Sequence, residues 1–463
     1  MSKASPLYAL VLFATACNCG PNQPLPDGGG GGAGGGGGAG CPQLTGQELV
    51  HQSDVTASET WAGDGAVHRI TFGITIRPGA VLTLAPCAVV KINPNLVVTV
   101  SGTPSQPAKL LAQGTADRPV LVTAATPGQG WGALRSLTPD ATFELSYTTL
   151  EQGGAGSSHG ASLSLQAGGD PGTSVVPMLK ADHLVIKGAA GTGLVMEGGA
   201  AFTADSTDLT VTGGGAVANG DSAIELTPLA AGTLPPLHVS GNARDQVRVA
   251  AGSLFISRDL TLKALGVPYF FYFDRVRVTD PGGTTPTLTL QPGVELRFDD
   301  YLMIGEAAAG NTTHAGRLLA VGTATNPIVF TSSRATRAAG DWPGIWLRSA
   351  AGSRIENARI EFAGGNNGIV SSNCKPTGSS DDAALFIGNT NLMDQYVPSA
   401  SDFASVTVVS SASHALNPIW TTASFGPDLT SGFVFPTPAT IGGCSQTRNG
   451  VTTGCSTRTC LVP

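Results

Sequence analysis

The stretch "KLLAQGTADRPVLVTAA" at residues 109–125 recurs as "RLLAVGTATNPIVFTSS" at residues 317–333, 208 positions later. Each stretch holds two short apolar runs, separated by a segment that begins with a Gly-Thr pair and ends with a Pro. Short apolar runs bounded by turn residues are typical of β-strands, and Gly and Pro mark the turns between strands. The repetition therefore predicts that one strand-turn-strand unit occurs twice in this chain.

Further pairs of similar stretches extend the duplication over about 200 residues. Residues 81–92, "VLTLAPCAVVKI", return as "TLTLQPGVELRF" at residues 287–298, and "GQGWGALRS" at 128–136 returns as "AGDWPGIWLRS" at 339–349. The offset between matching stretches drifts from 201 to 211 positions, which insertions in loops would cause. We therefore expect two long copies of one structural unit.

A finer rhythm runs within each copy. Short triplets whose first and last residues are aliphatic begin at Leu163, Leu184, Leu209 and Leu237, with spacings of 21, 25 and 28 residues. Periods of 20 to 30 residues, built from single strands and Gly-rich corners, indicate a solenoid. A β-sandwich array is the main alternative, and it would require antiparallel hairpins with Asn-Gly turns, which are few in this chain.

The composition favours strands and turns over long surface helices. Charged residues make up 12% of the chain and aromatic residues 6%, and Gly occurs 63 times. Exposed helix faces are populated by Lys, Glu and Arg, which are scarce here. The formal net charge of −7 and the lack of a basic run make a nucleic-acid partner unexpected.

The N-terminal region has the layout of an exported protein. Lys3 precedes an apolar run at residues 7–16, which is too short to span a bilayer but suits a signal peptide at residues 1–16. The small residues before Cys17 resemble the lipobox of bacterial lipoproteins, a resemblance that implies lipidation of Cys17 and a membrane partner through the lipid anchor. Cleavage by the general signal peptidase, giving a secreted protein, is the alternative. Residues 17–40 would then form a Gly-rich tether.

The remaining cysteines suit an oxidising compartment. The spacing in "CSQTRNGVTTGCSTRTC" at residues 444–460 lacks the CxxC pairs and histidines of a zinc site, so we expect no metal. Disulfides are expected instead among a C-terminal set, with the pairing left open. This candidate set comprises Cys374, Cys444, Cys455 and Cys460.

The quoted stretches together resemble the right-handed parallel β-helix of the pectate-lyase-like superfold, and more narrowly the β-helices of bacterial secreted proteins and lipoproteins. The resemblance covers most of residues 56–368, with Cys87 standing where the pattern has Gly. It implies an all-β, right-handed, single-stranded parallel β-helix solenoid. We expect a first unit at residues 41–240, a second at 241–440 and a Cys-containing cap at 441–463.

Enzymes of this superfold require paired carboxylates for hydrolysis, or acidic Ca²⁺ ligands with a basic Arg or Lys for the lyase reaction. The chain has candidate residues for these roles, but the companion motifs of the hydrolases are missing and the Asp182-His183 pair lacks the Trp of the lyase motif. The candidates are Asp299-Asp300, Asp381-Asp382, the "SHG" at 158–160, and Asp182 with His183.

Two further pairs of residues are equivalent in the duplicated units. Glu151 aligns with Glu361, so both are expected to be architectural carboxylates that face outward near a Gly corner. Trp131 aligns with Trp342, and each lies beside a Gly. These two tryptophans could cover a corner, belong to the core, or stack on a sugar.

These observations favour a protein without catalytic residues or cofactors, located in the cell envelope as an outer-membrane or cell-surface lipoprotein, or else secreted. We expect a binding or structural role, toward polysaccharide or another cell-surface polymer. A polysaccharide lyase or glycoside hydrolase on the same fold is the alternative.

Overall fold

The computed structural model describes most of the chain after residue 39. The described residues are 40–157, 160–216, 221–250, 255–272, 275–307, 313–366, 382–388, 396, 398–412, 414–420, 429–436, 440–441 and 444–445. The chain divides into two compact units, Met1–Gly36 and Gly37–Pro463, and all described residues belong to the second unit.

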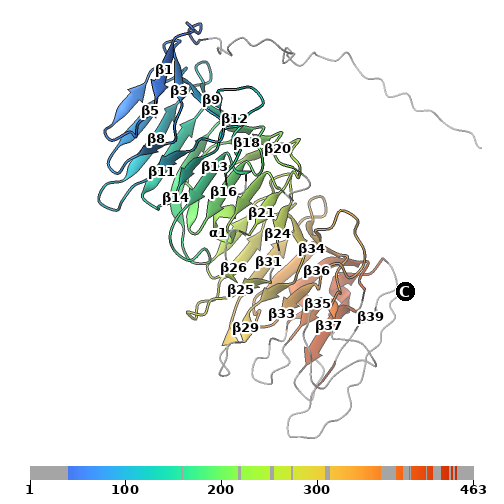
Figure 1. Ribbon diagram of the computed structural model, residues 1–463. Coiled ribbons are helices and arrows are strands. Elements are labelled where there is room, and N and C mark those ends of the chain that lie inside the picture. The colour runs from blue at the N-terminus through green and yellow to red at the C-terminus, as the bar shows by residue number, and fades with distance from the viewer. Residues whose placement is uncertain are drawn as a thin grey trace, which may run out of the picture. The chain divides into compact units, whose positions relative to one another are not determined.

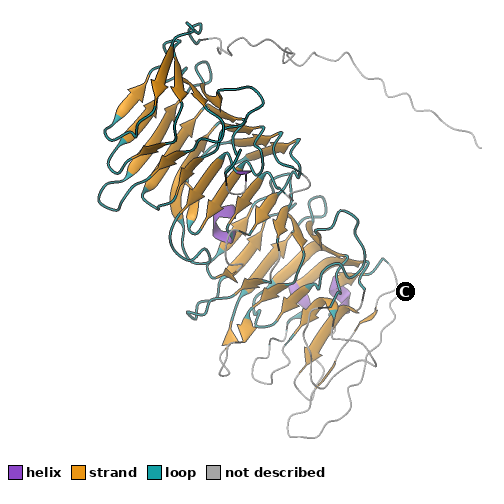
Figure 2. Ribbon diagram, viewed as in Figure 1, coloured by secondary structure: helices purple, strands orange, loops and turns teal. Residues whose placement is uncertain are grey.

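Short strands make up almost all regular structure of the described residues (Figure 2). Helical segments there are limited to α1 (Pro228–Ala231) and 3-10 turns at Ala400–Asp402 and Thr430–Gly432. None of these helices is long and apolar enough to cross a membrane. The predicted all-β class is confirmed.

The strands associate side by side and in parallel into four sheets, and their turns follow one another along the stack in Figure 1. Among the described strands, only β29 (Glu306–Ala307) and β30 (Thr313–His314) form an antiparallel pair. A β-sandwich array would require antiparallel neighbours throughout, so that alternative is wrong and the parallel β-helix solenoid is confirmed.

Sheets 1, 2 and 3 are visited in rotation by the first half of the chain. Sheet 1 comprises β1 (Glu48–His51), β3 (Val67–Ile70), β6 (Val89–Ile92), β9 (Val120–Ala124), β12 (Thr148–Glu151), β15 (Leu184–Lys187), β18 (Leu209–Thr212) and β20 (Leu237–Ser240). Sheet 3 comprises β2 (Glu59–Trp61), β5 (Val81–Leu84), β8 (Ala108–Gln113), β11 (Ala141–Ser146), β14 (Val176–Asp182) and β17 (Ala200–Phe202). The first half of sheet 2 comprises β4 (Ile74–Ile76), β7 (Val98–Val100), β10 (Leu134–Ser136), β13 (Leu163–Gln166), β16 (Leu194–Glu197), β19 (Ile224–Leu226) and β21 (Val247–Val249).

The second half of the chain continues sheet 2 and starts sheet 4. Sheet 2 goes on through β24 (Tyr269–Phe271), β27 (Glu295–Phe298), β32 (Ile328–Ser332), β34 (Arg354–Glu361), β31 (Arg317–Val321), β26 (Thr287–Leu290) and β23 (Leu260–Leu262), with β36 (Phe403–Val409) and β38 (Phe433–Val434) as a branch. Sheet 4 comprises β22 (Phe255–Ile256), β25 (Val276–Val278), β28 (Leu302–Ile304), β33 (Ile345–Leu347), β35 (Ala383–Ile387), β37 (His414–Trp420), β39 (Thr440–Ile441) and β40 (Cys444–Ser445).

The core consists of columns of aliphatic side chains. Each column contains the residues that occupy the same inward-facing position on successive turns. In sheet 1 the register places Val90, Val122, Leu150 and Ile186 next to one another on successive turns. All four are at most 3% exposed, whereas Leu121 and Thr149, on the opposite face of their strands, are partly exposed. In-register parallel pairing therefore converts the alternation of the sequence into one continuous apolar interior.

The two copies reproduce the same contacts. Trp131 Nε1 donates a hydrogen bond of 2.7 Å to the main-chain oxygen of Glu151, and Trp342 Nε1 donates one of 2.8 Å to that of Glu361. The hydroxyls of Thr123 and Thr331, the aligned threonines of the opening stretches, each donate at 3.3 Å to the side chain of the same glutamate. The duplicated sequence thus encodes a duplicated local structure, while the domain boundaries at residues 240 and 440 remain a prediction.

Strands of the second copy do not join the same sheets as their counterparts in the first copy, but the neighbouring sheet of the solenoid. β6 and β27 are equivalent in sequence, yet β6 lies in sheet 1 whereas β27 lies in sheet 2. Only sheet 2 continues across the junction, through β21, β24 and β27, because sheets 1 and 3 end at β20 and β17. The short helix α1 contacts both β17 and β23, and so occupies the place where sheet 3 stops.

Residues 40–47 form an N-terminal strap along the corners between sheets 3 and 1. The Gly40 amide donates to the carbonyl of Asp117 at 3.1 Å, Cys41 forms a disulfide with Cys87, and the Thr45 amide donates to the carbonyl of Gly65 at 2.9 Å. These three corners belong to consecutive turns, so the strap runs back from the third turn to the first. It then enters the outermost strand of sheet 1, β1.

Candidate functional site

Most cysteines predicted as functional lie outside the described residues. This holds for Cys17, Cys374, Cys455 and Cys460, while for Cys444 the backbone of β40 is described but not the side chain. Lipidation and the C-terminal disulfides therefore stay predictions. No prediction from the sequence included the Cys41–Cys87 disulfide. The signal in the sequence was Cys87, which stands where the repeat has Gly. The structure gives Cys87 a φ of +73°, a conformation that favours glycine.

The equivalent tryptophans belong to the core. Trp131 and Trp342 are both 0% exposed, and their indole nitrogens are satisfied by main-chain oxygens. Stacking of a sugar on either ring is thereby excluded. Glu151 is architectural as expected, because its carboxylate pairs with Lys187 at 3.1 Å on the next turn.

Asp182 and His183 lie at a corner between sheets 3 and 1, where their side chains pair with each other. His183 Nδ1 is 2.9 Å from Asp182 Oδ1, and the Thr207 hydroxyl donates to the same oxygen at 2.6 Å. The bond from Thr207, followed by that from His183, lowers the pKa of Asp182. The His183 ring stacks on Tyr147 at 4.3 Å. Residues on neighbouring turns thus contact both members of the pair: Thr207 donates to Asp182, and Tyr147 stacks on His183.

The remaining carboxylate candidates are not brought together. Asp299 accepts a hydrogen bond from the Ser333 hydroxyl, and Asp300 accepts one from the amide of Tyr301 at 2.7 Å. Asp382 is only 6% exposed, whereas Asp381 and residues 158–159 fall outside the described part of the chain. Within that part, no group of three or more His, Cys, Asp or Glu is placed to hold a metal ion.

A groove of about 900 Å³ crosses sheet 2 at the junction of the two copies. It forms because the loop before β21 and the loop after β32 rise on either side of the sheet. Its twelve lining residues include four arginines and two aspartates, in a chain with only 25 Lys and Arg in total. The lining comprises Ala243, Arg244, Asp245, Gln246, Phe270, Tyr272, Arg297, Asp299, Ser333, Arg334, Ala335 and Arg337.

The floor of the groove consists of outward-facing residues of β24 and β27. The register places Phe270 next to Arg297, and Arg248 of β21 on the other side of Phe270. The Arg248 guanidinium lies over the Tyr272 ring, 3.8 Å from its centroid, and also pairs with the buried Glu225 at 3.2 Å. The floor is therefore a rigid surface that combines aromatic rings with guanidinium groups.

The walls carry the most accessible positive charges. Arg244 is exposed, and although its carbonyl accepts from two backbone amides, its guanidinium makes no hydrogen bond or ion pair with the described residues. Arg334 is 66% exposed and lies 3.6 Å from Asp341, whereas the carboxylate of Asp245 is engaged by the amides of its own loop. Several guanidinium groups that line one groove suit an anionic ligand.

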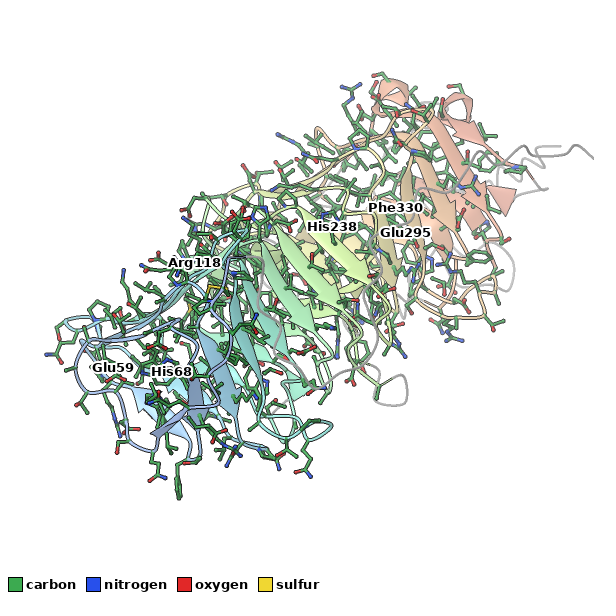
Figure 3. The ribbon with its side chains drawn as sticks, turned by 90° about the horizontal axis from the view of Figure 1, so that it is seen from above. Glu59, His68, Arg118, His238, Glu295 and Phe330 are labelled. Carbon is green, nitrogen blue, oxygen red and sulfur yellow. A yellow bond between two sulfur atoms is a disulfide. The ribbon has the colours of Figure 1, made fainter. Side chains whose placement is uncertain are left out.

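One carboxylate faces the arginines of the groove from the edge of the floor. Glu295 Oε1 accepts from Arg297 Nε at 2.7 Å and lies 3.4 Å from Arg337 Nη2 (Figure 3 labels Glu295). Glu295 and Arg297 come from β27, and Arg337 comes from the loop of the next turn.

The sequence carried one signal for this groove. Eight positions separate Thr123 from Trp131, but eleven separate the equivalent Thr331 from Trp342. The three extra residues lie in the loop that brings Arg334 and Arg337 to the groove. A loop that is longer in one copy only, and that carries two arginines where the shorter loop has none, marks a site that the repeat itself does not need.

A second cluster of ring side chains lies in the first turn, where Figure 3 labels Glu59 and His68. His51 Nε2 is 3.0 Å from His68 Nδ1, His68 Nε2 is 2.9 Å from the carbonyl of Ala62, and the His51 ring stacks on Trp61 at 3.8 Å. Burial lowers the pKa of His68 and, together with the neighbouring His68, that of His51. This cluster is packed rather than open.

The fold and the groove place the protein in the class of parallel β-helix solenoids that carry a surface groove. No protein-family model matches the chain, and no curated protein or solved structure matches it significantly. The function must therefore be argued from the groove itself.

Proposed function

We propose that the protein is a non-catalytic binding module that holds a segment of an anionic polysaccharide in the groove at the junction of its two copies. The observation that carries this proposal is the convergence of Arg244, Arg297, Arg334 and Arg337 on one groove with Phe270 and Tyr272 at its floor. Guanidinium groups bind carboxylates and sulfates through paired hydrogen bonds. Phe270 is only 5% exposed and Arg248 covers the Tyr272 ring, so these rings support the arginines rather than stack on a sugar.

We further propose that the protein is exported and anchored through lipid on Cys17, in keeping with the resemblance to β-helix lipoproteins of the pectate-lyase-like superfold. The apolar run at residues 7–16 and the Gly-rich segment after Cys17 support this layout. Mass spectrometry of the mature N-terminus tests it, and an unmodified N-terminus other than Cys17 would exclude the anchor.

The binding proposal is tested by calorimetric titration of the full chain with an oligomeric uronate and with a neutral oligosaccharide of equal length. Replacing Arg244→Gln and Arg334→Gln together is expected to weaken uronate binding about tenfold, because two exposed ion contacts of about 0.7 kcal/mol each are lost. Arg135→Gln is the matched control. It faces outward on the same sheet in the first copy, where its Nε donates to Thr99.

A polysaccharide lyase is the second candidate, because Glu295, Arg297 and Arg337 meet within 4 Å from two turns. In this reaction an arginine in its neutral form would remove the proton from the carbon next to the uronate carboxylate, while another guanidinium stabilises the negative charge. The glycosidic C–O bond at the neighbouring carbon then breaks, the oxygen leaves with a proton from water, and a carbon-carbon double bond forms. Unsaturated products in the titration mixture would replace the binding proposal with this one. Equal affinity for neutral and acidic oligosaccharides would refute the anionic ligand.

A further inference from the structure

Glu295 faces the same two arginines that an anionic ligand would contact on the groove floor. It stands two residues before Arg297 on one strand, so both side chains point outward from the same face of sheet 2. Its Oε1 receives the Arg297 Nε–H at 2.7 Å and lies 3.4 Å from Arg337 Nη2, and about a third of its side chain is exposed. Glu295 is not itself a lining residue, but its carboxylate contacts two arginines that are, so a ligand that binds Arg297 and Arg337 meets this carboxylate.

We propose that Glu295 is a built-in competitor that restricts the groove to ligands with several anionic groups. The proposal rests on the proposed function and specifies the ligand class. A ligand that carries a single anion exchanges one carboxylate for another at Arg297 and Arg337, and it is repelled by Glu295 at close range. A ligand with several anions also reaches Arg244 on one wall and Arg334 on the other.

The charges on the walls decide this preference. Arg244 has no ion pair among the described contacts, and Arg334 is 66% exposed with its partner Asp341 at 3.6 Å. Both guanidinium groups can accept an anion without first releasing a close bidentate partner. A charged oligomer bound at Arg297 and Arg337 thus gains two further contacts that offset the repulsion from Glu295, whereas a monomeric acid bound at the same two arginines gains none.

Glu295→Gln separates this role from simple positioning of Arg297. The amide keeps an oxygen that can accept the Arg297 Nε–H, but it removes the negative charge. If Glu295 is a competitor, the variant binds anions more tightly. If Glu295 only orients the guanidinium groups, the variant binds equally well or more weakly.

The experiment is calorimetric titration of the wild-type chain and Glu295→Gln with a hexameric uronate and with the monomeric uronate. The variant is expected to bind the hexamer about fivefold more tightly, the factor that corresponds to about 1 kcal/mol between neighbouring charges near water. The affinity for the monomer should rise by a larger factor than the affinity for the hexamer, so the ratio of the two affinities falls. Glu144→Gln, an exposed carboxylate 3.8 Å from Lys109 on another sheet, is the control and should change neither affinity.

The possible outcomes separate this inference from the proposed function. Hexamer binding that depends on Arg244 but is unchanged or weaker in Glu295→Gln would overturn the competitor role and leave the binding function standing. If neither the wild-type chain nor the variant binds the hexamer, both proposals fail. Thermal unfolding of each variant shows that the change in affinity does not come from a change in fold.

Discussion

At the scale of single residues, the corners between sheets depend on glycines that have no room for a side chain. A Cβ on Gly114 would lie 2.5 Å from the carbonyl oxygen of Tyr147, and one on the equivalent Gly322 would lie 2.5 Å from that of Asn357. Tyr147 and Asn357 themselves adopt positive φ angles of 41° and 45°. In both copies a corner without a side chain therefore packs against a corner with a left-handed backbone.

Gly114→Ala is expected to destabilise the protein by about 2 kcal/mol, because the methyl group must push the corner of the next turn away. The midpoint of thermal unfolding, followed by circular dichroism, measures this loss. Gly168→Ala is the control, since a Cβ there meets no atom within 4 Å, and it should shift stability by less than about 0.5 kcal/mol. Equal effects of the two substitutions would refute the close contact at Gly114.

The histidine pair of the first turn is a second feature at this scale. The Ala62 carbonyl can only accept, so His68 carries its proton on Nε2, and its Nδ1 accepts from His51 Nε2. Burial lowers the pKa of both rings, while Glu59 opposes this at both and Asp64 at His68. The hydrogen bond between His51 and His68 therefore requires that at least one ring stays neutral, because two protonated rings would have no acceptor nitrogen to share.

The first turn is expected to lose stability as the pH falls below about 6.5, the ordinary histidine pKa. In that range the unfolded chain binds protons that the folded pair does not, so acid favours unfolding. His51→Phe keeps a ring on Trp61 but cannot take a proton, and it should show a smaller drop in unfolding temperature between pH 7.5 and pH 5.5. A drop equal to that of the wild-type chain would contradict the assignment.

At the scale of elements, the strap depends on the Cys41–Cys87 disulfide, which closes a loop with a sequence separation of 46. The variant Cys41→Ser/Cys87→Gly is expected to cost about 4 kcal/mol from loop closure, felt mainly in β1 and β3. Hydrogen exchange should show faster exchange of these amides. Glycine is chosen because Cys87 has a φ of +73°, and the Cys87→Ser counterpart shows the added strain of a side chain there.

The positions of the strands could be predicted from the sequence, whereas the contacts of segments outside the repeat, such as the strap, could not. Residues 108–113 and 317–321 belong to the matching stretches, and both form strands in which buried and more exposed side chains alternate. Cys41 precedes the repeat, and nothing local to it indicates that the chain runs back along three corners to reach Cys87. Its pairing depends on the path of the strap, which is a long-range property of the fold.

At the scale of the whole unit, the duplication could be predicted from the sequence, but the placement of the second copy on the sheets could not. The matching stretches predicted two copies of one solenoid, yet they gave no sign that the second copy enters sheet 2 through β24, one face away from its counterpart β3. That shift is decided by the pairing of β21 with β24 across the junction. The groove lies on these same strands, so the sequence pointed to it only through the longer, arginine-containing loop after β32.

The strap determines where a mechanical load enters the protein. Any tension on the chain before Gly40 reaches the corner at Asp117 and the bond to Cys87 before it reaches β1. With the disulfide intact, the second and third turns bear that tension and the outermost strand is shielded from it. After reduction the same pull would act along β1 and peel it from β3 one hydrogen bond at a time.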